Sequence, residues 1–251
     1  MTPEDLERKV SQGKTEPFYF LYGPETFYHL EAIQLLSKKW INEENRDFNL
    51  ENFDAKTSNV NDWLGSAKTL SFLGGTKLVI VRNLHDAVPK DEAAQSLIDY
   101  CSNPVAEACL VIIADKIDKK RKIYKALTKL KGAIACIPPK EHTLVSWVQN
   151  RAKNEGYVMN INAARALVCR VGSRPGVLAQ ELNKTLMYAG KAKEVSENDV
   201  QEVVGETRFE NVFSLTDALK NKNSQKALQL LHNQLEHGEE AIKIMGTIAW
   251  Q

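Results

Sequence analysis

The chain has 251 residues, of which 43% are hydrophobic and 26% are charged, and its formal net charge is +1. This length suggests one or two domains with a substantial core. The near-neutral charge excludes a chain that attracts polyanions as a whole, so any nucleic-acid contact must be local. No N-terminal signal core and no run of about 18 apolar residues occurs, so we expect a cytoplasmic protein without a membrane partner. The four cysteines form no CxxC pair, which favours buried, reduced thiols over a metal site or disulfides.

Alternating strand and helix patterns fill the first half of the chain. Several of the strand runs are nearly continuous apolar β-formers, as in parallel strands that are covered on both faces. The predicted strands are residues 18–22, 48–53, 78–82, 109–114 and 133–137. The predicted helices between them are residues 25–42, 60–73, 91–102 and 119–131. This alternation predicts an α/β domain with a mainly parallel sheet.

A linker of sequence PPKEH at residues 138–142 ends this pattern, and no further strand is predicted after it. Short helices are expected at 143–155, 163–171, 176–188 and 196–204, followed by amphipathic helices at 213–221, 224–237 and 239–250. The last helix has an apolar face and no stop signal, so we expect the chain to be a shortened form of a longer protein. The expected domains are therefore residues 1–140, 141–208 and 209–251.

The first predicted strand runs into Gly23, the place where an ATP-binding protein has its phosphate loop. A loop of the form GxxxxGK[ST] needs glycines for amide groups that curl around phosphate, a lysine for the phosphates and a hydroxyl for Mg²⁺. Aligned on Gly23, the second glycine is replaced by Tyr28, the lysine by His29 and the hydroxyl by Leu30, while Pro24 removes an amide donor. The sequence predicts a loop that has the location of a nucleotide site without its chemistry.

The fourth predicted strand points to the same conclusion. In many ATPases such a strand ends in two carboxylates, one for Mg²⁺ and one to activate water, whereas here Asp115 is followed by Lys116. We therefore expect neither ATP binding nor hydrolysis, and no cofactor or metal. An ordinary strand–helix turn in an unrelated α/β fold remains an alternative reading of the same residues.

Five segments carry a resemblance to a known family. They read FLYGPE from residue 20, LSFLGGTKLVIVRN from 70, DKIDKKRKIYKAL from 115, LAQELNKTL from 178 and FENVF from 209. In these segments, which lie in order between residues 17 and 251, the chain resembles the delta subunit of bacterial DNA polymerase III. That subunit is the arm of the clamp loader that opens the sliding clamp.

The resemblance implies an architecture, a function and partners. The fold would be a RecA-like AAA+ parallel-sheet domain with a degenerate nucleotide site, followed by a small helical lid domain and the start of a helical collar domain. The chain would bind and open the β sliding clamp during replication without catalysis of its own, within a DNA-directed DNA polymerase (nucleotidyltransferase) holoenzyme. Its partners would be the clamp, the other loader subunits through the collar, which is incomplete here, and primed DNA within the assembled loader.

The predicted helix over residues 60–73 ends in an apolar pair that stands off its core stripe. At about 100° per residue, Phe72 and Leu73 lie roughly 140° and 120° from the centre of the stripe, on opposite sides. The stripe itself consists of Val60, Trp63, Leu64, Ala67 and Leu70. The pair could insert into a pocket of another protein, or the helix could fray early and let both residues fold back into the core.

The resemblance assigns this pair to the clamp. In the delta family, a pair just before the LVIV-like strand enters a hydrophobic pocket of the sliding clamp, which falls here on Phe72 and Leu73. Leu70, Ser71 and Gly74 are the expected neighbours in that contact.

Basic residues crowd the segment 116–131. A solvated basic face is one reading, and a surface that follows DNA phosphates is the other. The residues that would face DNA are Lys119, Lys120, Arg121, Lys122 and Lys125. Two rival functions therefore stay open: an active NTPase with an unusual phosphate loop, and a DNA-binding adaptor that acts through this segment.

Overall fold

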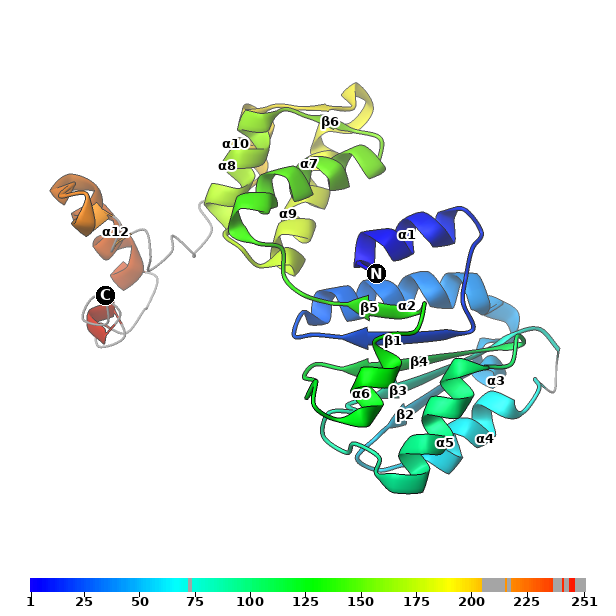
Figure 1. The fold of residues 1–251 in the computed structure, drawn as a ribbon. Coiled ribbons are helices and arrows are strands. Elements are labelled where there is room, and N and C mark those ends of the chain that lie inside the picture. Colours follow the sequence, from blue (N-terminus) through cyan, green and yellow to red (C-terminus); the bar gives the residue numbers. More distant parts are fainter. Residues whose placement is uncertain (72–73, 205–214, 216–217, 237–240, 242–243, 247–251) are drawn as a thin grey trace. The chain divides into compact units, whose positions relative to one another are not determined.

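The computed structural model describes residues 1–71, 74–204, 215, 218–236, 241 and 244–246 (Figure 1). The chain divides into two compact units, Met1–Pro138 and Pro139–Gln251. The further boundary expected between residues 208 and 209 lies outside the described residues and stays a prediction.

The first unit is built on a five-stranded sheet. Its strands are β1 (Phe18–Tyr22), β2 (Leu50–Asp54), β3 (Lys77–Arg82), β4 (Ala108–Ala114) and β5 (Ala133–Ala135). They lie in the order β2-β3-β4-β1-β5, and every neighbouring pair is parallel. In β1, Phe20 lies opposite Ile112 on one side and Ala133 on the other. The predicted α/β class with a parallel sheet is confirmed.

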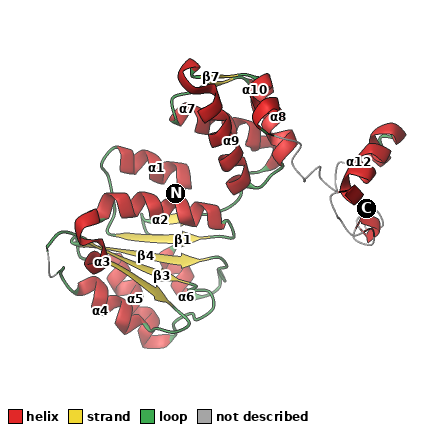
Figure 2. Cartoon of the chain, turned by 180° about the vertical axis from the view of Figure 1, so that it is seen from behind, coloured by secondary structure: helices red, strands yellow, loops and turns green. Residues whose placement is uncertain are grey.

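Helices cover both faces of this sheet (Figures 1 and 2). One face carries α1 (Pro3–Ser11) and α2 (Thr26–Trp40). The opposite face carries α4 (Val60–Lys68), α5 (Asp91–Ser102) and α6 (Lys122–Leu127). A short turn of 3₁₀-helix (Glu43–Asn45) and the four-residue helix α3 (Arg46–Asn49) lead into β2. Helices α1 and α3 and the 3₁₀ turn were not predicted from the sequence.

The core follows from the alternation of side chains along the buried strands. Phe20, Val79 and Leu110 are fully buried in one cluster with side chains of α4 and α5. Burial of each such side chain contributes about 1.5–3 kcal/mol. Within α4, Trp63 is buried and its indole Nε1 donates to the Ser58 hydroxyl at 2.8 Å. This packing fixes α4 and therefore the start of the segment that follows it.

The second unit contains a four-helix group and a separate small cluster. The group consists of α7 (Leu144–Asn154), α8 (Ile161–Val171), α9 (Pro175–Ala189) and α10 (Glu197–Val203), with 3₁₀ turns at Glu141–Thr143 and Gly190–Ala192. Two-residue strands β6 (Val158–Met159) and β7 (Glu194–Val195) pair in parallel, so the prediction of no strand here is wrong. Helix α12 (Ser224–Glu236) contributes Ala227 and Leu230 to a cluster with Leu215, Ala218 and Ile244.

The sequence also predicted that the cysteines are buried and that no segment spans a membrane. Three cysteines are buried and free as expected, but Cys169 is exposed because it lies on the solvent side of α8 rather than on the helix's buried stripe. No helix in the described part of the chain is both long enough and apolar enough to cross a membrane.

Candidate functional site

The loop at Gly23 is shaped by backbone packing. Gly23 has a φ of 128°, and a Cβ placed on it would lie 2.3 Å from the carbonyl oxygen of Cys136. The Gly23 amide donates to the Ala114 carbonyl at 3.0 Å, and the Glu25 amide donates to the Cys136 carbonyl at 3.1 Å. Because Pro24 has no amide hydrogen, three successive positions offer no free donor to a phosphate group. That the loop binds no ATP stays a prediction.

The side chains that replace the phosphate-binding residues begin helix α2. Tyr28 and His29 are buried, at 2% and 4% exposure, whereas Leu30 is exposed to solvent. Burial lowers the pKa of His29 below its ordinary value, although the Asp115 carboxylate acts in the opposite direction. The His29 Nδ1 atom lies 3.7 Å from Asp115 Oδ1, and its Nε2 atom has no hydrogen-bond partner among the described residues. A neutral, buried imidazole therefore stands where a phosphate-binding loop has its lysine.

The carboxyl edge of the sheet, where α/β proteins commonly bind ligands, carries a small polar group. The Asp115 amide donates to His85 Nδ1 at 3.2 Å, which links the ends of β3 and β4. Nearby, Asp86 forms an ion pair with Lys56 at 2.9 Å. Within the described ranges, no three His, Cys, Asp or Glu side chains are arranged to hold a metal ion.

The segment after α4 differs from its prediction. The helix ends at Lys68 instead of continuing to residue 73, because Thr69 has an extended backbone and its hydroxyl donates back to the Gly65 carbonyl at 2.7 Å. As a result, Leu70 leaves the stripe that Val60 and Ala67 share, and its exposure is 70%. The prediction that Leu70 belongs to the buried stripe is therefore wrong.

The two residues predicted to contact the clamp, Phe72 and Leu73, lie outside the described residues. The helical argument that placed them off the core stripe no longer applies, because the helix ends before them. Their neighbours are described, and Leu70 and Ser71 precede them while Gly74 follows. We call this segment, residues 70–74, the tip loop.

A buried asparagine holds the base of the tip loop. Asn49, at 2% exposure, donates from Nδ2 to the Gly74 carbonyl at 3.2 Å. The Ser71 hydroxyl lies 2.5 Å from Asn49 Oδ1 and 2.9 Å from the Gly74 carbonyl, and its single hydrogen can serve one of these acceptors at a time. The Gly74 amide closes the loop by donating to the Ser71 carbonyl at 3.3 Å. Sequence reasoning missed Asn49: it placed this residue inside the predicted strand 48–53, whereas Asn49 ends α3, and an asparagine gives no sign from its type that it is buried.

Two glycines let the chain turn back from the tip loop into β3. Gly74 and Gly75 have φ values of 76° and 83°, in the left-handed region that favours glycine. The first Cβ position is open and the second lies 3.6 Å from Asn49 Nδ2. Backbone conformation, rather than lack of space, therefore explains why glycines occupy these two positions.

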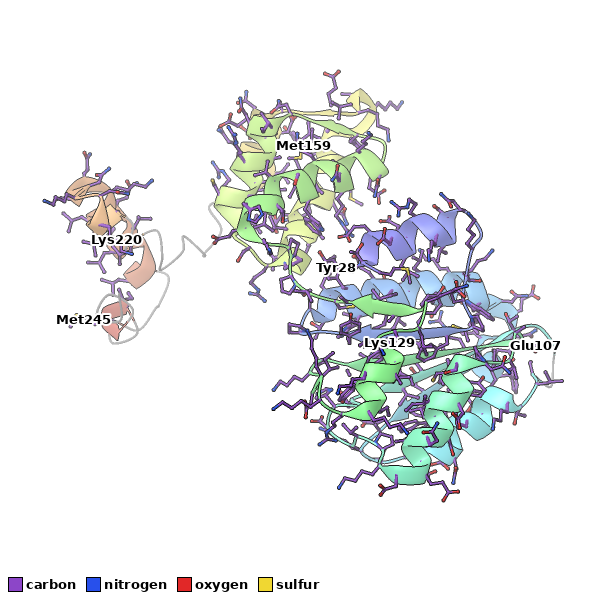
Figure 3. All side chains as sticks on the ribbon, viewed as in Figure 1. Tyr28, Glu107, Lys129, Met159, Lys220 and Met245 are labelled. Atoms are coloured by element: carbon purple, nitrogen blue, oxygen red, sulfur yellow. The ribbon has the colours of Figure 1, made fainter. Side chains whose placement is uncertain are left out.

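The basic segment is exposed, but its helix is shorter than predicted. Helix α6 spans only Lys122–Leu127. It starts late because a turn precedes it, in which the Asp118 side chain accepts from the Lys120 amide at 2.9 Å and the Asp118 carbonyl accepts from the Arg121 amide. The five residues predicted to face DNA are all exposed, and they are Lys119, Lys120, Arg121, Lys122 and Lys125. Lys129, in the same basic segment, is also exposed and is labelled in Figure 3. A role in DNA contact stays a prediction.

Comparisons with known proteins agree with the resemblance found in the sequence. The family model described as DNA polymerase III, delta subunit, matches residues 19–137, and the model for the C-terminal domain of the same subunit matches residues 209–251. The DNA polymerase III subunit delta of Bacillus subtilis (strain 168) is 28% identical over 255 residues, which cover 98% of this chain and 74% of that protein.

A solved structure of a delta protein gives the same relationship. The structure of the Bacillus subtilis DNA clamp loader delta protein matches with a TM-score of 0.79 and 27% identity, over 98% of this chain and 75% of that one. Thermotoga maritima RuvB, a Holliday junction branch migration motor, matches with a TM-score of 0.43 and 10% identity, over 88% and 76%. On the two family models and the Bacillus subtilis relative, the chain belongs to the DNA polymerase III delta subunit family.

Proposed function

We propose that this chain binds the β sliding clamp through the tip loop and favours the open form of the ring. The observation that carries the proposal is the exposure of Leu70 beside a loop whose base is held by the buried Asn49. An exposed leucine next to an aromatic residue and a second leucine provides the apolar anchor that protein interfaces use. Membership of the delta family supplies the identity of the partner.

The proposed mechanism is mechanical and requires no catalytic residue in this chain. A closed ring exists in equilibrium with a distorted, open form. A partner that binds the open form more tightly shifts the equilibrium by the difference between its two binding free energies and by no more. The apolar tip loop would supply this difference by contacting a pocket at the ring interface.

Further partners belong to the same proposal. We infer that residues 209–251 belong to the collar through which delta subunits join the other loader subunits, which agrees with the match to the family's C-terminal domain. The exposed basic residues around α6 would lie near primed DNA in the assembled loader. The cytoplasm is the compartment in which the proposal places the chain, because bacterial chromosomal DNA is replicated there.

A binding assay with immobilised sliding clamp from the same source tests the proposal. Replacement of Phe72 and Leu73 by alanine should weaken binding by at least roughly 30-fold, the effect of losing one central anchor that contributes about 2 kcal/mol, and by up to roughly 900-fold when both residues are anchors. Met187→Ala is a matched control, because Met187 is an apolar side chain at 81% exposure on α9. Equal clamp affinity in the wild type and the double variant, both folded by circular dichroism, would refute the proposal.

A further inference from the structure

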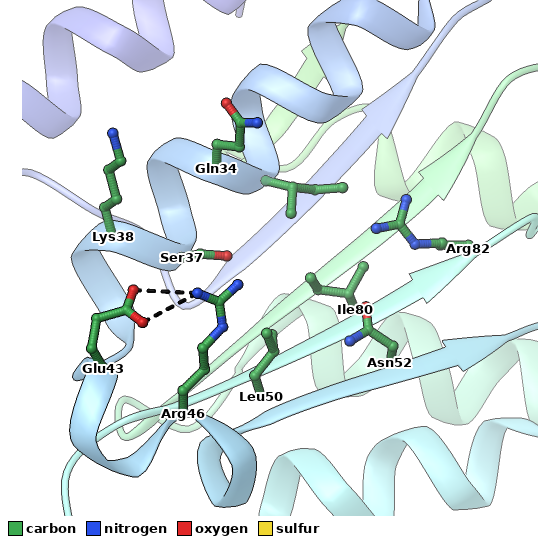
Figure 4. Close-up of a pocket in the computed structure, with 10 residues that line it drawn as sticks. Gln34, Ser37, Lys38, Glu43, Arg46, Leu50, Asn52, Ile80 and Arg82 are labelled. Atoms are coloured by element: carbon green, nitrogen blue, oxygen red, sulfur yellow. Dashed lines mark hydrogen bonds and ion pairs between the residues drawn. The ribbon is translucent and has the colours of Figure 1, made fainter.

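A second candidate site lies between α2 and the edge of the sheet. A pocket of about 330 Å³ opens there (Figure 4). Its apolar floor consists of Ile33 from α2, Leu50 from β2 and Ile80 from β3. The pocket exists because β2 is an edge strand and α2 leaves its outer part uncovered, so that Leu50 is only half-buried and Asn52 is exposed. Its described lining is separate from the Gly23 loop and includes none of that loop's residues.

Basic side chains from three different elements surround this floor. Arg46 comes from α3 and Arg82 from the end of β3, and Figure 4 shows both guanidinium groups directed into the space below α2. Lys38 of α2 stands at the rim, and Glu43 is the one carboxylate among the described lining residues. Glu43 is engaged with Arg46, since the Arg46 Nη1 atom lies 3.2 Å from Glu43 Oε2.

Arg82 is the residue that points to a ligand. It is half-buried, and no hydrogen-bond or ion-pair partner of its guanidinium is found within the described part of the chain. No Arg82 nitrogen is among the buried side-chain atoms that lack a partner in the described residues, so water reaches the guanidinium, and an anion that enters the pocket would replace this water with charge-assisted hydrogen bonds. The nearby amides of Gln34 and Asn52 and the hydroxyl of Ser37 add neutral donors.

We propose that this pocket binds a small phosphorylated compound, with the phosphate group between Arg46 and Arg82. Guanidinium groups match phosphate oxygens with paired hydrogen bonds, which makes arginine the preferred residue for this recognition. The volume is at the lower end of the range for small-molecule sites, and the apolar floor suits a ring or carbon chain attached to the phosphate. A nucleic-acid strand needs a continuous basic groove with stacking aromatic side chains, whereas this pocket is short and its described lining contains no aromatic residue.

Isothermal titration calorimetry of the whole chain with inorganic pyrophosphate tests this site. We expect saturable binding at low salt that weakens as salt is added. Arg82→Gln and Arg46→Gln should each weaken binding by about tenfold or more, because each removes charge-assisted hydrogen bonds. Glu43→Gln should tighten binding by roughly two- to fivefold, because it removes the competing carboxylate. Tighter binding by the Glu43→Gln variant cannot result from misfolding, because a misfolded protein would bind pyrophosphate more weakly.

Arg8→Gln is the matched control, since it removes the same charge from the exposed surface of α1 and should leave the affinity unchanged. The proposal is overturned if pyrophosphate shows no saturable binding at millimolar concentration. It is equally overturned if both arginine variants bind like the control. Binding of a single-stranded oligonucleotide that depends on Arg82, without any binding of pyrophosphate, would instead assign the pocket to DNA and overturn the small-molecule proposal.

Discussion

Replacement of Asn49 by alanine tests whether the tip loop must be held in place to bind its partner. The substitution removes the bond from Asn49 Nδ2 to the Gly74 carbonyl and the acceptor at Asn49 Oδ1, and it leaves a small cavity at a site with 2% exposure. The Gly74 carbonyl keeps the Ser71 hydroxyl as a donor, so the net change is one hydrogen bond rather than two. A net hydrogen bond contributes about 0.5–1.5 kcal/mol, and with the cavity we expect the free energy of unfolding to fall by about 1–3 kcal/mol.

The effect on the clamp is separate from the effect on stability. A loop that loses about 1 kcal/mol of local order must recover it on binding, so the affinity for the clamp should fall by about fivefold. Asn49→Asp should be more harmful, because it keeps an acceptor for Ser71 but places a buried carboxylate against the Gly74 carbonyl. Surface plasmon resonance on immobilised clamp and urea unfolding measure the two quantities.

A matched control separates loop order from global stability. Thr185→Ala also removes a buried polar group, whose hydroxyl donates to the Glu181 carbonyl at 2.9 Å in the second unit. It should lower the free energy of unfolding without changing clamp affinity. The reasoning is refuted if Asn49→Ala binds the clamp as the wild type does, while the variant with alanine at Phe72 and Leu73 still binds weakly.

Three further results are expected. Gly23→Ala should lower the free energy of unfolding in urea by more than about 2 kcal/mol, because the φ of 128° disfavours a side chain and the new Cβ would lie 2.3 Å from the Cys136 carbonyl oxygen. Gly13→Ala should lower it by less, because Gly13 has a φ of 75° but open space around it. Burial lowers the pKa of His29 in the folded chain below its ordinary value of 6.5. When the pH falls below 6.5, His29 therefore takes up a proton more readily in the unfolded chain than in the folded one, so the free energy of unfolding should fall as the pH falls. Thermal unfolding of His29→Gln should show a shallower decrease in stability between about pH 7 and pH 5, and an equally steep decrease would contradict this cause. Glutamine at Lys119 and Lys122 should make the dependence of log affinity for duplex DNA on log salt less steep, by about 0.9 for each phosphate that the protein no longer neutralises. An unchanged slope would remove these two residues from the interface with DNA.

The centre of the sheet could be predicted from the sequence because β1, β3 and β4 are buried on both faces. The run 18–22 matches β1 at both ends, and the run 109–114 misses β4 by one residue. Such runs need no knowledge of the tertiary fold, since apolar β-formers follow one another without interruption. The two-residue strands β6 and β7 offered no such run, and their pairing depends on the helices that bring them together.

Helix ends were harder to predict, because side-chain hydrogen bonds decide them locally. Apolar periodicity suggested that α4 continues to residue 73. The helix instead ends at Lys68, where the Thr69 hydroxyl donates a hydrogen bond back to the Gly65 carbonyl. The candidate site divides in the same way. Periodicity placed Val60 and Trp63 in the core, but the exposure of Leu70 and the burial of Asn49 depend on how the chain turns after the helix.

The close approach of Gly23 to the Cys136 backbone has a consequence for how this loop could change. Exchanging Tyr28 for glycine, His29 for lysine and Leu30 for serine would restore the letters of an ATP-binding loop, but the amides of Gly23 and Glu25 would remain bonded to Ala114 and Cys136. Three mutations would therefore produce a motif without a binding site. A return to nucleotide binding would require the ends of both β4 and β5 to shift away from the loop, which is a change of architecture and not of side chains.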